Sequence, residues 1–235
     1  MHVKFLPLDH IEAAACGVLD GYGQKFAPVA APPVPADEIL ECLLNLSMMF
    51  DDLPRLLEQP GVLGAVRFRE AEVLVDQSLD PTENPQKEGR YRFTIAHEMG
   101  HWELHRHTFL QNANQPLLFD AGPGPMHACR SGATEPIEWQ ANTFAGFLLM
   151  PGPMVLQAWE EQQGSMDPYD AREELKDLSA RWGLADDNKP TVSVAKTMAA
   201  RFKVSGQAMQ IRLIGLGLIQ TRIQPASLFS QGASR

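Results

Sequence analysis

Hydrophobic residues recur at intervals of three and four positions along much of the chain, which is the spacing of one face of an α-helix. This pattern predicts four separate helices, over residues 9–20, 37–49, 92–105 and 135–149. Residues 168–219 have the same spacing, with breaks at Gly183, near Pro190 and at Gly206. The pattern therefore indicates a mainly helical protein.

Two short stretches have a different pattern and predict a small β-sheet. Residues 62–68 and 72–76 are rich in Val and other apolar residues, and residues 69–71 are expected to form the turn between them. The polar segment 80–90 and the segment 106–133, which contains many Asn, Gly and Pro residues, are expected to be irregular. Together with the helices, the two strands indicate the α+β fold class.

Changes in pattern along the chain also predict its domain organisation. We expect one domain over residues 1–155, with a Pro- and Ala-rich connector at about 26–36, a helical subdomain over 165–220 and a flexible tail over 221–235. Within the subdomain, the sequence predicts a helix, a short turn and a second helix with Ser205 as its N-cap. This arrangement is helix-turn-helix-like.

Composition and charge narrow the range of partners. The chain has 44% hydrophobic residues, which is typical of a folded protein, and a net charge of -9. A general nucleic-acid binder needs a surplus of Lys and Arg to neutralise phosphates. The second helix of the helix-turn-helix-like pair offers only Gln207, Gln210 and Arg212 as polar readers of bases. We therefore expect these helices to pack on the first domain or to grip a protein, without direct nucleic-acid binding.

The cysteines and the N-terminal segment bear on the cellular compartment. Cys16, Cys42 and Cys129 are far apart and odd in number, so they predict neither a disulfide framework nor a cysteine zinc site. Charged residues interrupt the apolar residues at the N-terminus, and no apolar run is long enough to span a bilayer. We expect a cytoplasmic protein without membrane contact.

Residues 97–101 contain the candidate chemistry. His97 and His101 are four positions apart on a predicted helix, so their imidazoles lie on one face and can bind a single Zn²⁺. Glu98 lies between them and can act on water at the metal, as in the HExxH motif of zinc peptidases. The spacing predicts a zinc site with Glu98 as its catalytic residue.

A catalytic zinc needs a third protein ligand, for which there are two candidates. His107 has the spacing of motifs in which a glycine turns the chain back toward the metal, but Leu104 stands where that glycine is needed. Glu138, on the predicted helix 135–149, is the preferred candidate. Asn142 is four residues further on the same face and is expected to hydrogen-bond a ligand imidazole and orient it.

Two blocks of the sequence resemble the ImmA/IrrE family of zinc metallopeptidases. They read RFTIAHEMGHWELH at residues 92–105 and EWQANTFAGFLLMP at residues 138–151. The resemblance implies a mainly helical, zincin-like peptidase domain, zinc ligands at His97, His101 and Glu138, and Glu98 as the catalytic residue. Several members of that family cleave or inactivate a helix-turn-helix transcriptional repressor and so switch on stress or mobile-element genes. The resemblance thus implies a protein substrate and a role in transcription regulation.

Two functions from different classes remain open. One is a zinc-dependent endopeptidase that cleaves a regulatory protein at a specific site. The other is a non-catalytic zincin scaffold that binds a partner protein, as in a toxin–antitoxin-like pair. The intact Glu98 favours the peptidase, because a scaffold that only binds has no need of a general base.

Peptide hydrolysis also needs a group that stabilises the oxyanion. Tyr91, His105 and His127 are candidates for that role or for substrate contact, and the residues alone do not distinguish them. The strand pair at 62–76 offers an edge on which an extended substrate could add, unless that edge is covered. Cys129 is interpreted as a partly buried thiol in preference to a metal ligand.

Overall fold

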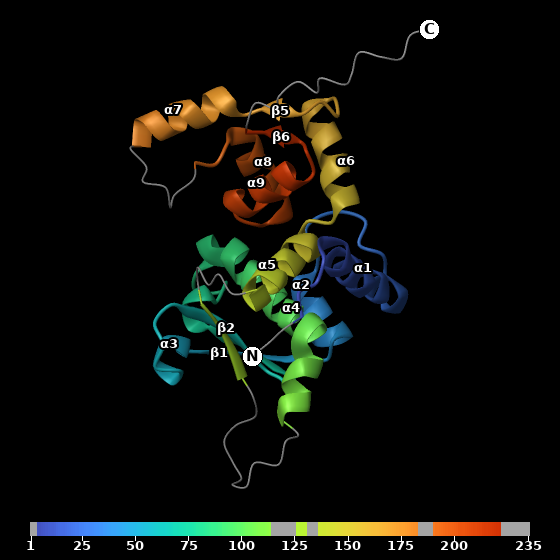
Figure 1. Cartoon of the computed structure of the whole chain (residues 1–235), viewed down its shortest axis with the longest axis vertical. Coiled ribbons are helices and arrows are strands. Elements are labelled where there is room, and N and C mark those ends of the chain that lie inside the picture. The colour runs from blue at the N-terminus through green and yellow to red at the C-terminus, as the bar shows by residue number, and fades with distance from the viewer. Residues whose placement is uncertain (1–3, 114–125, 131–135, 183–189, 222–235) are drawn as a thin grey trace.

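The computed structural model describes residues 4–113, 126–130, 136–182 and 190–221, with the backbone alone at 111–113, 126–130 and 179–182. Helices form most of this part of the chain (Figure 1). The helices are α1 (Leu8–Lys25), α2 (Ala36–Glu38), α3 (Leu53–Leu56), α4 (Glu88–Ala113), α5 (Pro136–Leu149), α6 (Gly152–Gln163), α7 (Arg172–Trp182), α8 (Ser193–Phe202) and α9 (Gly206–Gly215). A π-helical turn, Ile39–Leu43, follows α2, and two short 3₁₀ turns are Gln77–Leu79 and Pro85–Lys87.

A four-stranded sheet lies beside these helices, with the order β1-β3-β2-β4. Its strands are β1 (Ser47–Asp51), β2 (Val62–Arg67), β3 (Glu72–Asp76) and β4 (Met126–Arg130). Strand β2 is antiparallel to both β3 and β4, whereas β1 is parallel to β3. The α+β class is confirmed, and so are the two strands expected within residues 62–76.

Both edges of that strand pair are covered, which is the alternative that the sequence left open. Strand β4 covers β2 on one side, and β1 covers β3 on the other. An added strand would therefore have to pair with β1 or β4. The segment 106–133 had been expected to be irregular, but it begins inside α4 and contains β4.

The helix expected over residues 37–49 is only partly formed. The helical turns end at Leu43, Asn45 has a left-handed φ of 54°, and Ser47–Asp51 is strand β1. An apolar run this short fits a helix or a strand, and pairing with β3 decides in favour of the strand. Met49 is 51% exposed on this strand.

Helix α1 is longer than its sequence pattern indicated, because it continues through Gly21 and Gly23. The absence of a side chain allows close packing: a Cβ atom on Gly23 would lie 3.3 Å from Cα of Pro28. Close approach of the following segment therefore offsets the conformational cost of glycine in a helix. Helix α4 likewise begins before the predicted start at 92 and ends after the predicted end at 105.

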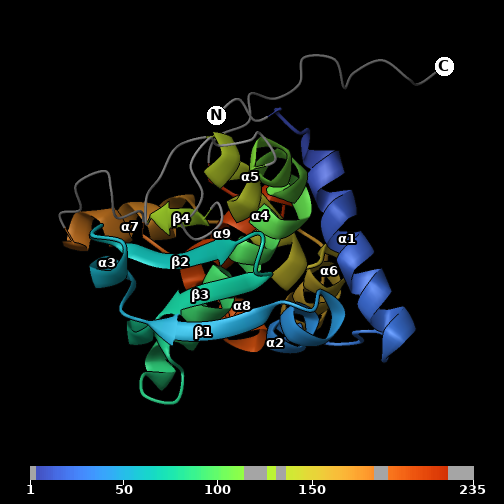
Figure 2. The same cartoon turned by 90° about the horizontal axis from the view of Figure 1, so that it is seen from below.

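The elements around the sheet form layers (Figure 2). Helix α4 packs on one face of β2 and β3, α5 packs on α4, and α1 packs on α5. A separate small cluster joins α3 to the sheet through Leu53, Val62, Ala65 and Leu74. The long α4 is thus covered on both sides, which explains why residues along much of its length are buried.

Helices α6 to α9 gather at one end of the molecule, where the short strands β5 (Tyr169–Asp170) and β6 (Ile219–Gln220) pair in parallel (Figure 1). Ser205 accepts a hydrogen bond from the backbone N–H of Ala208, as its predicted N-cap position requires. Hydrophobic residues of α8 and α9 belong to the same core cluster as those of α1 and α5. Helix α6 runs across the boundary region between the two segments that the sequence predicted.

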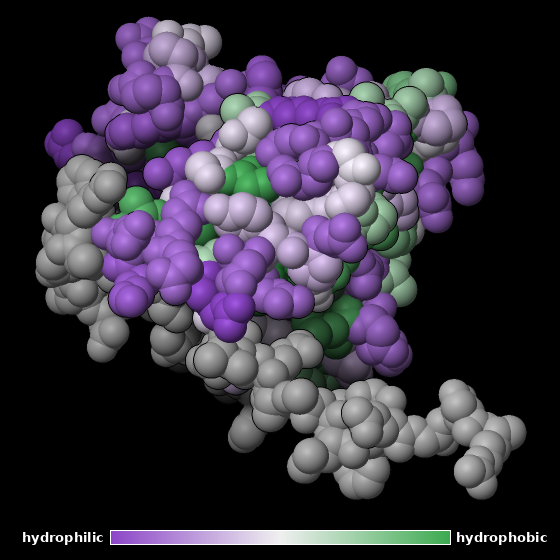
Figure 3. Space-filling model, turned by 90° about the horizontal axis from the view of Figure 1, so that it is seen from above, coloured by the Kyte–Doolittle hydropathy of each residue, from purple (hydrophilic) through white to green (hydrophobic). Residues whose placement is uncertain are grey.

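The polar residues of α9 are mostly engaged inside the protein. Arg212 donates to the carbonyl oxygen of Met150 and to Glu12, and Gln210 bonds the backbone at Pro190 and Val192. Figure 3 shows the molecule from the side of α6 to α9, where hydrophilic residues cover most of the surface and hydrophobic ones form small patches. Two of the three candidate base readers are therefore unavailable. No helix in the described ranges is long and apolar enough to cross a membrane.

Candidate metal centre

The candidate centre lies where α4 and α5 cross at close range. Gly100 permits this approach: a Cβ atom there would lie 3.1 Å from both Cα and the carbonyl oxygen of Ala141. Ala141 and Ala145 are fully buried in the contact, as expected for small residues between two close helices. The crossing brings Glu138 of α5 opposite the histidine face of α4.

Three side chains converge at this crossing. The Nε2 atoms of His97 and His101 are 3.0 Å apart. Glu138 places Oε2 at 3.3 Å from Nε2 of His97 and Oε1 at 3.4 Å from Nε2 of His101. A tetrahedral ion with ligand bonds of about 2.0–2.1 Å has its ligand atoms about 3.3 Å from one another. These three residues are the group in the described part of the chain that could hold a metal ion.

Burial and charge favour a cation between these groups. His97 is 6% exposed, His101 is 0% exposed and Glu138 is 4% exposed. Burial opposes protonation of His97, but the hydrogen bond to Glu138 and the charges of Glu98 and Glu138 outweigh it and raise the pKa of His97. Two imidazole nitrogens that face a carboxylate are stable together only with a proton or a metal ion between them. Two imidazoles and one carboxylate are also a donor set that suits a catalytic Zn²⁺.

Asn142 contacts the first of the two histidines. Its Oδ1 lies 3.0 Å from Nδ1 of His97. An amide oxygen can only accept, so Nδ1 of His97 carries a proton, and Nε2 is left to face Glu138 with either a proton or a metal ion between them. The contact matches the orienting role expected of Asn142 from its position four residues after Glu138.

Glu98 lies on the side of α4 that faces the sheet and is fully buried. A Cβ atom on Gly64 of β2 would lie 2.4 Å from Oε1 of Glu98 and 2.7 Å from Cγ2 of Thr94, so a larger residue at this point of the strand would force these side chains to shift. The charge of Glu98 contributes to the raised pKa of the adjacent His97. Glu98 is therefore held against the strand, next to His97.

The hydroxyl of Tyr91 is engaged by other residues of the protein and does not face the candidate centre. Its hydroxyl donates to Asp37 and contacts Sδ of Met48 at 3.4 Å, and the side chain is buried. Burial, followed by the hydrogen bond to Asp37, raises the pKa of Tyr91 above its usual range. With its hydroxyl occupied two turns before Glu98, Tyr91 is not retained as a candidate for the oxyanion.

The other histidines considered in the sequence lie in different surroundings. His105 is buried behind His101, with its Nδ1 at 3.2 Å from Nδ1 of His101, so it does not face a substrate. His107 is exposed on α4 and lies outside the group of converging side chains, as Leu104 had indicated. The side chains of His127 and Cys129 on β4 lie outside the description, and their roles stay predictions.

Two residues at this centre were missed in the sequence. Gln140 hydrogen-bonds His105, and Gly64 makes room for Glu98. A glycine inside an otherwise apolar strand indicates a close approach and was a signal for Gly64. Gln140 gave no such signal, because a Gln on a helix is ordinarily a solvated residue.

No curated protein matches the chain. Among solved structures, the chain is similar to a Mycobacterium tuberculosis transcriptional regulator, with 14% identity and a TM-score of 0.44 over 88% of this chain. The match covers 52% of that protein, so this chain spans about half its length.

The family match covers all three converging side chains. The IrrE N-terminal-like domain of the Peptidase_M78 family matches residues 82–213, which is more than half of the chain. The matched range includes the histidines of α4 and the carboxylate of α5. The chain belongs to the Peptidase_M78 family, and the buried group of His97, His101 and Glu138 is its candidate metal site.

Proposed function

We propose that this protein is a zinc-dependent endopeptidase that cleaves a regulatory protein at a specific site. The observation that carries the proposal is the convergence of His97, His101 and Glu138 beside the buried Glu98. We place this chemistry in the domain over residues 1–155. We propose that the helical subdomain over 165–220 grips the substrate, since its exposed α9 side chains include Ile211 and Ile214.

The residues of the centre have separate tasks. His97, His101 and Glu138 would hold Zn²⁺. When bound, zinc supplies a Lewis acid for the scissile carbonyl and lowers the pKa of water toward neutrality. Glu98 accepts a proton from the attacking water on its carboxylate and then donates it to the nitrogen of the leaving amine.

The substrate class comes from the resemblance to the ImmA/IrrE family. We propose a helix-turn-helix transcriptional repressor as the substrate and transcription regulation as the outcome. The acidic net charge of -9 supports a protein partner over direct contact with nucleic acid.

Two measurements test the proposed activity. Elemental analysis of protein purified without chelators should find one zinc per chain, and Glu98→Gln should abolish cleavage while zinc stays bound. Glu103→Gln is the matched control, because Glu103 lies on the same helix in a partly exposed ion pair with Arg106 at 3.6 Å. Protein without stoichiometric zinc would contradict the site, and full cleavage by Glu98→Gln would contradict the mechanism.

A third measurement tests the substrate. Partners captured with Glu98→Gln are incubated with the wild-type protein, and the products are read by mass spectrometry. One discrete cut in one partner supports site-specific regulation. Stable capture without any cut by the wild-type protein would favour a non-catalytic scaffold. Casein serves as a general protein substrate, and many cuts in it would favour broad digestion.

A further inference from the structure

A chain of three hydrogen bonds leads from the N-terminal segment to the candidate metal ligand His101. The Nε2 amide of Gln140 donates to the backbone carbonyl of Lys4 at 3.1 Å. Oε1 of Gln140 lies 3.1 Å from Nε2 of His105, and Nδ1 of His105 lies 3.2 Å from Nδ1 of His101. The side chain of His101 then presents Nε2 to His97 and Glu138.

The backbone carbonyl of Lys4 determines the direction of every bond in this chain. A carbonyl can only accept, so the amide of Gln140 must point its NH₂ group at Lys4 and its oxygen at His105. His105 must therefore carry its proton on Nε2, which leaves Nδ1 as an acceptor. His101 must then donate from Nδ1, and its Nε2 keeps the lone pair that a metal ion requires.

Burial makes this arrangement specific. Gln140 and His101 are fully buried and His105 is 1% exposed, so solvent does not reach the three side chains that make these hydrogen bonds. In such surroundings a reversed proton on either imidazole would leave two donors or two acceptors facing each other, which costs free energy. The contact of His97 with Asn142 is less shielded from solvent than these bonds, because Asn142 is exposed.

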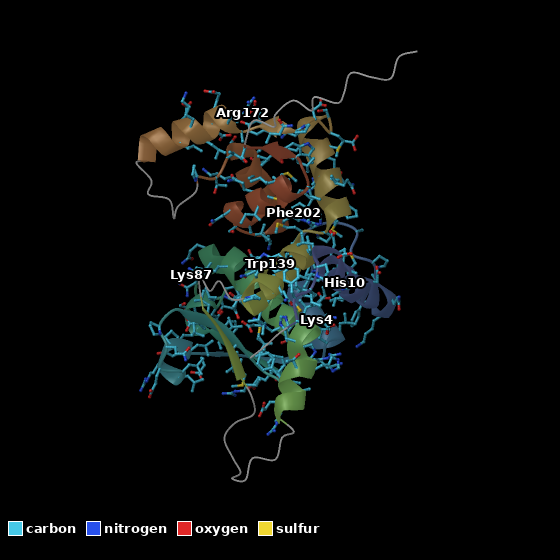
Figure 4. All side chains as sticks on the ribbon, in the orientation of Figure 1. Lys4, His10, Lys87, Trp139, Arg172 and Phe202 are labelled. Atoms are coloured by element: carbon cyan, nitrogen blue, oxygen red, sulfur yellow. The ribbon has the colours of Figure 1, made fainter. Side chains whose placement is uncertain are left out.

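The N-terminal segment is held in place at the start of this chain. The ring of Phe5 stacks on Trp139 with centroids 5.6 Å apart, and Leu6 packs against the core. Figure 4 shows Lys4 and Trp139 close together beside α5. These contacts bring the carbonyl of Lys4 to Gln140, although the two residues lie 136 positions apart in the sequence.

We propose that His105 and Gln140 are positioning residues that hold His101 in the tautomer with the proton on Nδ1, and so strengthen zinc binding at Nε2. Neither residue touches the metal or the substrate in this role. The effect on zinc rests on the proposed zinc site, whereas the tautomer is a property of the metal-free protein as well.

Two substitutions at Gln140 separate positioning from packing. Both substitutions remove the donor to Lys4; Gln140→Met keeps the volume but also removes the acceptor for His105, whereas Gln140→Glu keeps that acceptor but buries a charge. Positioning predicts that Gln140→Met weakens zinc binding about 10–100-fold, whereas Gln140→Glu stays within about threefold of the wild type or binds more tightly. Zinc affinity is measured by competition with a chromophoric chelator. Packing alone predicts the opposite order, and that order, or an unchanged Gln140→Met, would overturn the proposal.

A second pair of variants tests His105 itself. His105→Phe keeps a ring at this position but removes both nitrogens, and it should weaken zinc binding about 10–100-fold. His107→Phe, two residues further at an exposed position of the same helix, is the control and should leave the affinity unchanged. Equal affinities for the two variants would overturn the proposal.

The tautomers are read directly in metal-free protein by ¹⁵N NMR of the imidazole nitrogens. His101 should have its proton on Nδ1 in the wild type and lose this preference in Gln140→Met. A wild-type His101 protonated on Nε2, or one unaffected by Gln140→Met, would contradict the proposal. Wild-type protein that shows the predicted tautomer but binds no zinc would contradict the proposed function alone.

Discussion

Gly64 and Glu98 are in direct contact across the interface between β2 and α4. A Cβ atom on Gly64 would lie 2.4 Å from Oε1 and 3.1 Å from Cδ of Glu98. The proposed general base therefore occupies the space that a side chain on the strand would fill. The position of Glu98 is set by the sheet as well as by its own helix.

Replacing Gly64 with Ala should displace Glu98 and slow cleavage. A shift of about 1 Å in a catalytic group can cost roughly 100-fold in rate. We therefore expect Gly64→Ala to lower kcat by about 10–100-fold while stoichiometric zinc remains, measured by cleavage kinetics and elemental analysis. Gly17→Ala is the control, because a Cβ atom on Gly17 of α1 meets no atom within 4 Å. Unchanged kcat in Gly64→Ala would show that Glu98 does not need this space.

Removing the amide of Asn142 should weaken zinc binding at His97. The Nδ1 atom of His97 would lose its acceptor at 3.0 Å, and with it the orientation of its ring. Loss of such a contact typically costs about 10–100-fold in metal affinity. Asn142→Ala should show this loss in a chelator competition, whereas Asn142→Asp should keep the affinity because it keeps the acceptor. Equal affinities for the two variants would argue against an orienting role.

Enlarging Gly100 should force α4 and α5 apart. A Cβ atom there would lie 3.1 Å from the backbone of Ala141 and 3.2 Å from Cβ of Phe144. Overpacking of this kind typically costs about 1–3 kcal/mol of stability. We expect Gly100→Ala to lower the free energy of unfolding of metal-free protein by about that amount in urea. Gly146→Ala is the matched control, because its nearest neighbour would be Cε of Met150 at 3.9 Å.

Removing Arg212 should destabilise the attachment of α9. The guanidinium bonds the carbonyl of Met150 at 2.9 Å, reaches Glu12 at 3.0 Å and lies 4.5 Å from the ring centre of Phe147. Because the side chain of Glu12 is 46% exposed, most of the loss should come from the buried carbonyl, which is left without this donor. We expect Arg212→Met to lower the free energy of unfolding by about 1.5–3 kcal/mol, measured by urea unfolding.

The control for that prediction is another arginine pair. Arg201 bonds Glu161 at 2.6 Å, but both side chains are more than 40% exposed. Exposed ion pairs contribute little to stability, so Arg201→Met should change the unfolding midpoint only slightly. A similar effect from both arginine substitutions would show that burial of Arg212 is not the cause.

Elements whose local spacing carries the signal could be predicted from the sequence. His97 and His101 are four residues apart, and helix geometry alone places them on one face. The strand pair within residues 62–76 and the N-cap at Ser205 likewise follow from neighbouring residues. For β1 the local signal failed, because a short, mainly apolar run such as 46–50 suits a helix or a strand equally well.

The tertiary structure decided which segments far apart in the chain come into contact. Glu138 meets the two histidines because Gly100 and Ala141 let α4 and α5 cross closely. Gly64 meets Glu98 because β2 lies against α4, and Lys4 meets Gln140 because Phe5 stacks on Trp139. The spacing of HExxH by itself predicted a metal site with two histidines. Its third ligand, the space for its base and the bonds that orient its imidazoles depend on helix and sheet packing, which no local periodicity encodes.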